Sequence, residues 1–320
     1  MAVKTMNKKG IFFTFISVVL MASLIIILTP RATENFASES QVAKTRVVSV
    51  NNFILDLKSS YLENILEVSS HKAIIALTSY VEDNGPFADL NELQSFFSEA
   101  MLQGTIDGNP QEIMEGNTII NWTDKMANVS RNTLNVETGF RIGIVAISQL
   151  RPFFVELNLS LNMSVVSETS LWNITSHVVN AELSIQNLDD PYYIAYGDYN
   201  NKINKTDTAI DEWNTETVLE HITHGTYRHN EGAPNFLQRF TSLASPSSEC
   251  CGIESIVDST KVVSGQKSVS YMDYTFLRTS SDCPNLNLYT ANGIPADTKF
   301  DFSHLVLYNI TQGSTQICPS

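Results

Sequence analysis

The sequence has few charged residues, and basic ones are the scarcest. Charged side chains make up 17% of the 320 residues, with 20 Lys and Arg against 34 Asp and Glu, for a net charge of −14. Binding to nucleic acid without sequence preference needs Lys and Arg to displace phosphate counterions. We therefore expect no nucleic acid among the partners. Hydrophobic residues reach 43%, which is enough for a folded core and excludes a disordered chain.

Common catalytic motifs are also missing. The sequence contains no Gly-x-Gly-x-x-Gly, no Walker A motif, no His-Glu-x-x-His and no Gly-x-Ser-x-Gly. Residues 252–255 read Gly-Ile-Glu-Ser, but the second glycine of a nucleophile elbow is absent. We therefore predict that the protein is not an enzyme and has no catalytic residue and no cofactor.

Cysteine is rare. The four cysteines all lie in the last quarter of the chain: Cys250, Cys251, Cys283 and Cys318. An even number favours two disulfides in an oxidising compartment, and four cysteines allow three pairings. A bond between the adjacent Cys250 and Cys251 would close a strained ring, so we expect each to reach Cys283 or Cys318.

The N-terminus has the pattern of a membrane segment. Residues 1–10 carry three Lys and no acid, and residues 11–28 carry no charge and no proline. As a helix, this run spans about 27 Å, close to the ~30 Å core of a bilayer. The Lys excess predicts a single-pass cell-membrane protein with a cytoplasmic N-terminus and an extracellular C-terminal domain. A cleaved secretory signal is the alternative, although its apolar core is usually shorter.

The junction of these segments resembles a class III, type IV prepilin leader. Lys8-Lys9-Gly10 is followed directly by Ile11-Phe12-Phe13. The resemblance implies cleavage between Gly10 and Ile11, and a helix that anchors the subunit or packs in a filament core. Phe15 stands where the family has Glu, which favours a minor subunit over a major one. An uncleaved signal anchor is the alternative.

Seven Asn-x-Ser/Thr sequons predict N-glycosylation. They are Asn121, Asn128, Asn158, Asn162, Asn173, Asn204 and Asn309. Asn121 and Asn128 share one face of a predicted helix, and Asn158 and Asn162 share the solvent face of a predicted strand. Glycans at these positions would leave the packing undisturbed.

Three helices are predicted before residue 139. Apolar residues recur every three or four positions over about 39–82, and Asp83-Asn84-Gly85-Pro86 ends this long amphipathic helix. Asp89-x-x-Glu92 is a capping box for a second helix, which Gly104 ends. A third helix is predicted over about 117–137.

Beyond residue 140 the period changes to two. Apolar and polar residues alternate over 155–165 and again over 179–185, which predicts antiparallel strands with one face on helices and one face exposed. Residues 211–240 favour a helix. Short strands are predicted at 252–258, 261–277 and 303–310.

These patterns predict an α+β fold. It consists of an N-terminal membrane helix and a long helical spine, followed by a β-rich head with an antiparallel sheet. The predicted parts are a cytoplasmic leader (1–10), a transmembrane or assembly helix (11–29), a helical spine region (30–138) and a β-rich extracellular head (139–320).

This layout resembles the pilin lollipop. Segments within 183–193, 252–256 and 268–271 are similar to stretches of archaeal pilin-like surface proteins. The resemblance implies a membrane-anchored, surface-exposed structural protein, minor or accessory, in a filament or its assembly complex. The implied partners are the membrane, prepilin peptidase, the pilus assembly machinery and other pilin-like subunits. The alternative is a permanently anchored adhesin or receptor-type ectodomain with a ligand patch near Tyr192–Tyr199.

Histidines provide a further, weaker hypothesis. His221 and His224 are three apart on a predicted helix and His229 follows, so the three are candidate Zn²⁺ ligands of a surface metalloenzyme. Their spacing matches no zinc signature, so a solvated helix end is the simpler interpretation and we predict no metal. Asp189 and Asp190 open an oxygen-rich stretch with weak Ca²⁺ character, but the EF-hand order is absent.

Overall fold

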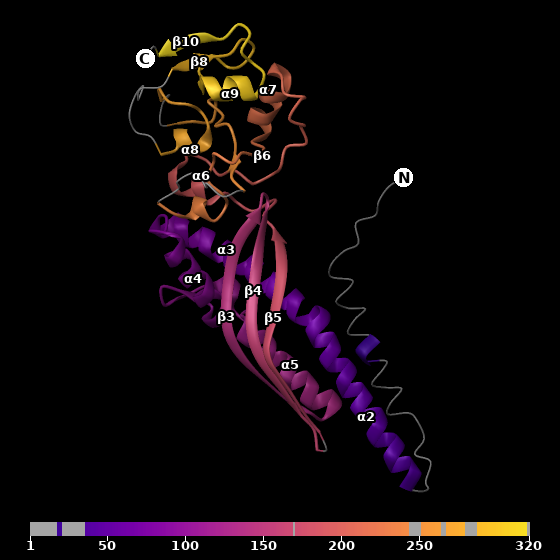
Figure 1. Cartoon of the computed structure of the whole chain (residues 1–320). Helices are drawn as coiled ribbons and strands as arrows, with labels where there is room; N and C mark the ends of the chain where they lie inside the picture. The colour runs from indigo at the N-terminus through magenta and orange to yellow at the C-terminus, as the bar shows by residue number, and fades with distance from the viewer. Residues whose placement is uncertain are drawn as a thin grey trace.

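The computed structural model describes residues 18–20, 36–168, 170–242, 251–263, 267–278 and 287–318. The fold is α+β with antiparallel sheets (Figure 1). The predicted cleavage site, Gly10 and Ile11, lies outside the described residues, as does most of the predicted membrane segment.

Within the described ranges, no helix combines the length and the apolarity that a bilayer crossing requires. A spanning helix needs about 20 mostly apolar residues. By contrast α3 (Leu62–Asn84) carries Glu63, Glu67 and Lys72 among its residues. This finding contradicts the predicted single-pass membrane location.

Residues 36–84 are helical in three consecutive segments: α2 (Phe36–Asp56), η1 (Leu57–Tyr61) and α3. η1 is a π-helical turn, and its flanking residues keep right-handed helical angles, so the chain continues through it without a break. Apolar residues spaced three or four apart, from Val50 to Val81, turn inward and are buried. Gly85, with φ of 82°, ends the run, and its N–H donates to the Val81 carbonyl.

Two capped helices follow. The Asp89 side chain accepts hydrogen bonds at the start of α4, and Gly104 ends that helix in the left-handed conformation, as predicted. Thr118 and Asn121 form a capping box at the start of α5. The bounds are α4 (Leu90–Gln103), β1 (Thr105–Ile106), β2 (Asn109–Pro110), η2 (Glu112–Met114) and α5 (Ile119–Leu134).

A three-stranded antiparallel sheet covers these helices, in the order β3 (Glu137–Arg151), β4 (Phe154–Val166), β5 (Leu171–Ser184). β4 alternates as predicted, with every odd residue from Val155 to Val165 buried. The sheet packs against α3, α4 and α5, and its other face is open (Figure 1). The sequence pattern does not predict β3, because two register shifts against β4 interrupt the alternation of apolar and polar residues along it.

The described residues between 185 and 318 form short elements joined by long connections, and this part alone, without the three long strands, is called the head from here on. Its elements are α6 (Pro191–Tyr196), α7 (Thr215–His224), β6 (Arg228–His229), η3 (Gln238–Phe240), β7 (Ile253–Glu254), α8 (Asp273–Phe276), β8 (Leu288–Thr290), β9 (Phe300–Asp301), α9 (Phe302–Leu307) and β10 (Thr315–Cys318). The strands predicted at 261–277 and 303–310 are wrong, since α8 and α9 lie there. The Asp301 side chain caps α9 by accepting the His304 N–H, which favours a helix over an extended segment.

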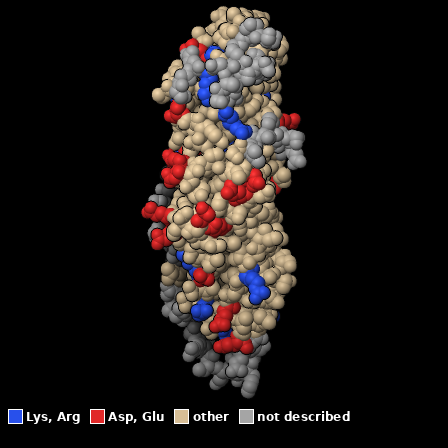
Figure 2. Space-filling view, turned by 90° about the vertical axis from the view of Figure 1, so that its left-hand side faces the viewer, with Lys and Arg blue, Asp and Glu red and all other residues tan. Residues whose placement is uncertain are grey.

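The head sits at one end of the helices and the sheet (Figure 1). Phe87, in the loop before α4, joins the two parts: its N–H donates to the Phe240 carbonyl, and its own carbonyl accepts the Ser242 N–H. Its ring centre lies 5.7 Å from that of Tyr80 and 6.3 Å from that of Phe240. Acidic side chains are spread along one long face of the molecule and outnumber basic ones there (Figure 2).

Candidate functional site

The head encloses three charged side chains that are fully buried. The Nη2 atom of Arg239 lies 2.6 Å from Asp190 Oδ2 and 2.5 Å from Asp273 Oδ2. Its Nη1 atom donates to the carbonyl of Ile253. All three charged side chains are 0% exposed, so one guanidinium balances two carboxylates away from water.

Segments far apart in the sequence supply this cluster. Asp190 caps α6, Arg239 lies in η3, and Asp273 begins α8. The Tyr227 hydroxyl donates to Asp190 over 2.6 Å, and the Ser255 hydroxyl donates to Asp273 over 2.8 Å. Burial raises the pKa of the Tyr227 hydroxyl well above its usual range, so this group stays protonated and can donate.

A second charged cluster surrounds Glu254, which is also 0% exposed. His304 Nε2 lies 3.2 Å from its Oε2 atom, and Arg228 Nε lies 3.5 Å from its Oε1 atom. The other ring nitrogen of His304 lies 2.6 Å from Asp301 Oδ2. Burial by itself would lower the pKa of His304, but the hydrogen bonds to Asp301 and Glu254 raise it to about 9. His304 is therefore an imidazolium at neutral pH.

These two clusters suit a structural role better than a catalytic one. Their central carboxylates are paired and closed to solvent, so no substrate can reach them without unfolding the surrounding loops. Breaking a buried pair leaves an uncompensated charge at high cost. The clusters therefore fix the positions of the long connections in the head, where regular secondary structure is scarce.

The histidine hypothesis is not supported. His221 is buried, and its Nδ1 lies 2.5 Å from Thr226 Oγ1. His224 and His229 are exposed, and the His224 Nδ1 lies 3.0 Å from the carbonyl oxygen of Glu220. Across the part of the chain that the structure describes, no three His, Cys, Asp or Glu side chains are grouped to hold a metal.

Parts of the predicted tyrosine patch and of the acidic stretch are buried. Tyr192 and Tyr193 are buried, and the Tyr193 ring packs 5.2 Å from that of Tyr199. Tyr192 and Tyr193 are therefore not available to a ligand at the surface, whereas Tyr196 and Tyr199 are half-buried. Asp190, a weak Ca²⁺ candidate, is already neutralised by Arg239.

The predicted modification sites are scattered over the surface. Asn128, Asn162, Asn173 and Asn309 are exposed, whereas Asn121, Asn158 and Asn204 are half-buried. Cys251 is buried and disulfide-bonded. Cys250 and Cys283 lie outside the described residues, as does the side chain of Cys318, and the predicted pairing stays a prediction.

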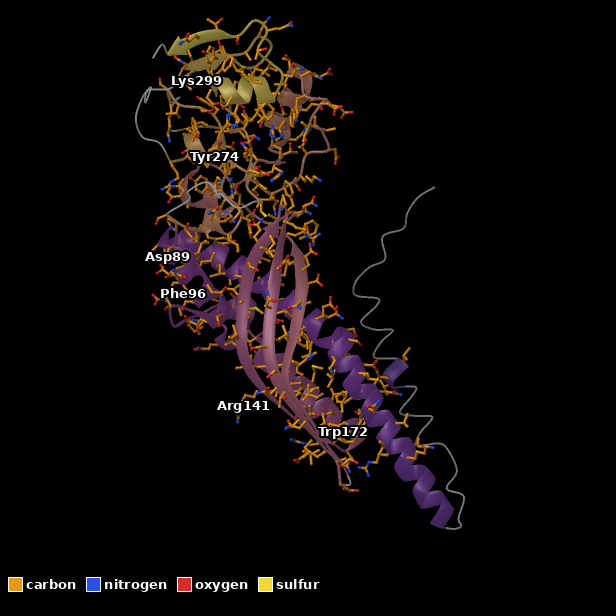
Figure 3. The ribbon with its side chains drawn as sticks, viewed as in Figure 1. Asp89, Phe96, Arg141, Trp172, Tyr274 and Lys299 are labelled. Atoms are coloured by element: carbon orange, nitrogen blue, oxygen red, sulfur yellow. The ribbon has the colours of Figure 1, made fainter. Side chains whose placement is uncertain are left out.

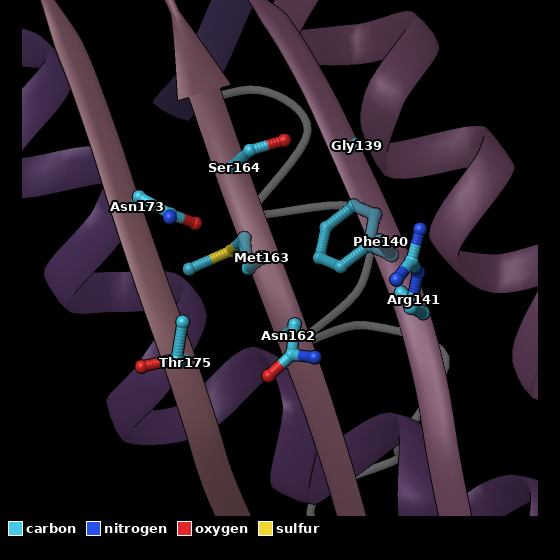
Figure 4. A pocket seen from close by; sticks show the side chains of 8 residues that line it. All are labelled: Gly139, Phe140, Arg141, Asn162, Met163, Ser164, Asn173 and Thr175. Carbon is cyan, nitrogen blue, oxygen red and sulfur yellow. The ribbon is translucent and has the colours of Figure 1, made fainter.

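The open face of the sheet carries a polar hollow of about 440 Å³ (Figure 4). Gly139 leaves its floor free of a side chain, opposite Ser164. Arg141, Asn162 and Asn173 are among the residues that line it. Arg141 lies on the sheet, far from the head residues Tyr274 and Lys299 (Figure 3). This hollow is therefore separate from the buried charge clusters.

Sequence reasoning misses Arg239 and Asp273. The signal available is a single charge inside an apolar run, Phe236-Leu237-Gln238-Arg239-Phe240 and Tyr271-Met272-Asp273-Tyr274. Such isolated charges are buried only when they are paired. Comparison with protein-family models, with curated proteins and with solved structures finds no match for this chain.

Proposed function

We propose that this chain is a non-catalytic structural protein, a minor or accessory subunit of a filament or of its assembly complex. This is the role implied by its resemblance to pilin-like proteins. In this proposal the helical run 36–84 serves as a spine that carries the head. The proposal includes no membrane anchor.

The observation that carries the proposal is the exposed apolar surface of the helical run. Val48 and Leu55 lie seven residues apart on one face of α2 and are 50% and 53% exposed, although Val50, Ile54 and Leu57 of the same run are buried. Val68 of α3 is a further apolar side chain that is 44% exposed. Neighbouring exposed apolar side chains on one helix face support packing against another subunit. The closed charge clusters of the head are consistent with a structural role.

Chemical cross-linking of lysines in a native extract tests this proposal. Lys44 and Lys58 lie on the exposed side of the helical run, so we expect them to cross-link to lysines of other chains. Lys202, in the head, serves as the reference for random collisions, because its side chain is 60% exposed. Cross-links from Lys44 and Lys58 that are confined to their own chain would contradict the proposal.

The hollow on the sheet favours a second candidate, an adhesin- or receptor-type binding module. Its lining combines the polar side chains of Arg, Asn, Ser and Thr with Phe140 and Met163, and this mixture suits a small ligand with hydroxyl groups and an apolar face, such as a saccharide. Arg141 makes no ion pair within the described residues and is the cation available to an acidic group. Binding in a glycan array that Arg141→Ala abolishes would support this candidate, and no binding by the unaltered chain would remove it.

A further inference from the structure

The β3 edge of the sheet is occupied by a side chain in place of a strand. β3 has β4 on one side only. On its other side, Gln94 of α4 donates its Nε2–H to the Val145 carbonyl over 3.1 Å, and its Oε1 accepts the Ile147 N–H over 3.0 Å. One primary amide therefore satisfies two main-chain groups that an edge strand normally leaves unpaired.

The spacing of these two groups indicates a strand direction. In a parallel pair, one residue bonds to the carbonyl of residue i and the N–H of residue i+2 on its neighbour, whereas an antiparallel partner uses both groups of a single residue. Val145 and Ile147 stand in the first relation. The Gln94 amide thus takes the place of one residue of a parallel strand opposite Ala146.

Space for a strand lies beside this edge. A groove of about 630 Å³ runs between α4 and β3, lined by Gln94, Ser98 and Gln103 of the helix and by Ile144–Ala146 of the strand. Glu99 is the one acid in the lining, and it already accepts hydrogen bonds from Thr105 and Gly108. The other lining residues are uncharged, so the groove suits a peptide backbone, which needs only about 4.8 Å between strand axes.

The opposite edge of the same sheet provides the matching strand. Both neighbouring pairs of the sheet are antiparallel, so β5 runs in the same direction as β3. A second copy translated within the plane of the sheet, across the strands, would therefore place its β5 beside the β3 of the first copy and parallel to it. The backbone N–H and C=O groups of Val145 and Ile147 point away from β4. Because these directions alternate along the hydrogen-bond ladder, the backbone groups of Val178, Asn180 and Glu182 in β5 also point away from β4. Both edges also carry exposed apolar side chains, Ile144 at 72% and Val178 at 55%.

We propose that the β3 edge is the docking site for the β5 edge of a second copy of this chain, and that Gln94 occupies the edge until that strand displaces it. The contact uses different surfaces on the two copies, so it leaves a free edge at each end and can propagate in one direction. This inference rests on the proposed function as an assembly subunit and names its partner.

Sedimentation equilibrium of the purified full chain and its variants tests the inference. Gln94→Ala frees the two edge groups, so it should self-associate at a concentration about tenfold lower than the unaltered chain. Gln103→Ala is the matched control: it lines the same groove but makes no hydrogen bond to β3 within the described residues, and it should behave as the unaltered chain. Adding Asn180→Pro to Gln94→Ala removes an outward N–H from β5 and should abolish the gain.

Two results would overturn the inference. One is a Gln94→Ala chain, folded by circular dichroism, whose association matches that of the unaltered chain. The other is a Gln94→Ala/Asn180→Pro chain, equally folded, that associates as readily as the single variant. If intermolecular cross-links from Lys44 and Lys58 persist in either case, the docking site fails while the proposed function stands.

Discussion

Replacing Arg239 with Met tests how the head is held together. The change keeps most of the side-chain volume but removes the cation that balances Asp190 and Asp273, both 0% exposed. The two buried carboxylates, 2.6 Å and 2.5 Å from the lost guanidinium nitrogen, then keep only the hydrogen bonds from neutral groups such as Tyr227 and Ser255 and have no cation to balance them. Breaking a buried pair costs about 3–5 kcal/mol, a large part of the stability of an ordinary domain.

The assay is urea unfolding followed by circular dichroism at pH 7. Arg151→Met is the matched control, because Arg151 pairs with Glu182 on the surface, where their side chains are 57% and 38% exposed. That pair should contribute no more than about 1 kcal/mol. Burial raises the pKa of Asp273, an effect that Arg239 opposes, so the loss in Arg239→Met should shrink at acid pH as this carboxyl protonates. Equal losses in the two variants would refute the reasoning.

Three further predictions concern stability. The pKa of His304 is raised from 6.5 to about 9. The charged His304 therefore stabilises the folded chain fully below pH 6.5, and this contribution, about 3 kcal/mol, should be lost as the pH rises through 9. Urea unfolding midpoints across this range should fall in the unaltered chain and stay level in His304→Gln. Burial lowers the pKa of His221 to about 4. The contribution of the neutral His221 to the stability of the fold is therefore present above pH 6.5 and should be lost as the pH falls through 4. An acid unfolding curve that His221→Phe leaves unchanged would contradict this. Gly252→Ala should lower the thermal midpoint by several degrees, because a Cβ there would lie 2.1 Å from the Ala233 carbonyl oxygen. Scanning calorimetry checks it, with Gly232→Ala as the control, because a Cβ there would meet only Asn230 Oδ1 at 3.4 Å, an ordinary contact.

Local patterns predict the elements that depend on local physics. The Asp89 cap, the Gly104 stop and the alternation of β4 are each set by a few neighbouring residues, and the structure confirms them. β3 is missed because its register shifts leave no steady period for a pattern to reveal. α8 and α9 are mistaken for strands because short apolar runs fit either element.

The buried clusters could not be predicted in the same way. Asp190, Arg239 and Asp273 are separated by at least 34 residues, and only the tertiary fold brings them together. The histidines illustrate the reverse: His221, His224 and His229 are close in sequence, yet His221 turns into the core while the other two face solvent. Closeness in sequence therefore does not bring these side chains together, whereas Arg239 and Asp273, single charges within apolar runs, meet in a buried cluster.

The central claim is that this chain works as a subunit of an assembly. The most direct test is the mass of the particle that contains it in a native extract, measured by gradient sedimentation with detection of this chain. We expect a particle several times heavier than the 35.6 kDa of one chain. A single species at the mass of one chain, under conditions that preserve other assemblies in the same extract, would contradict it.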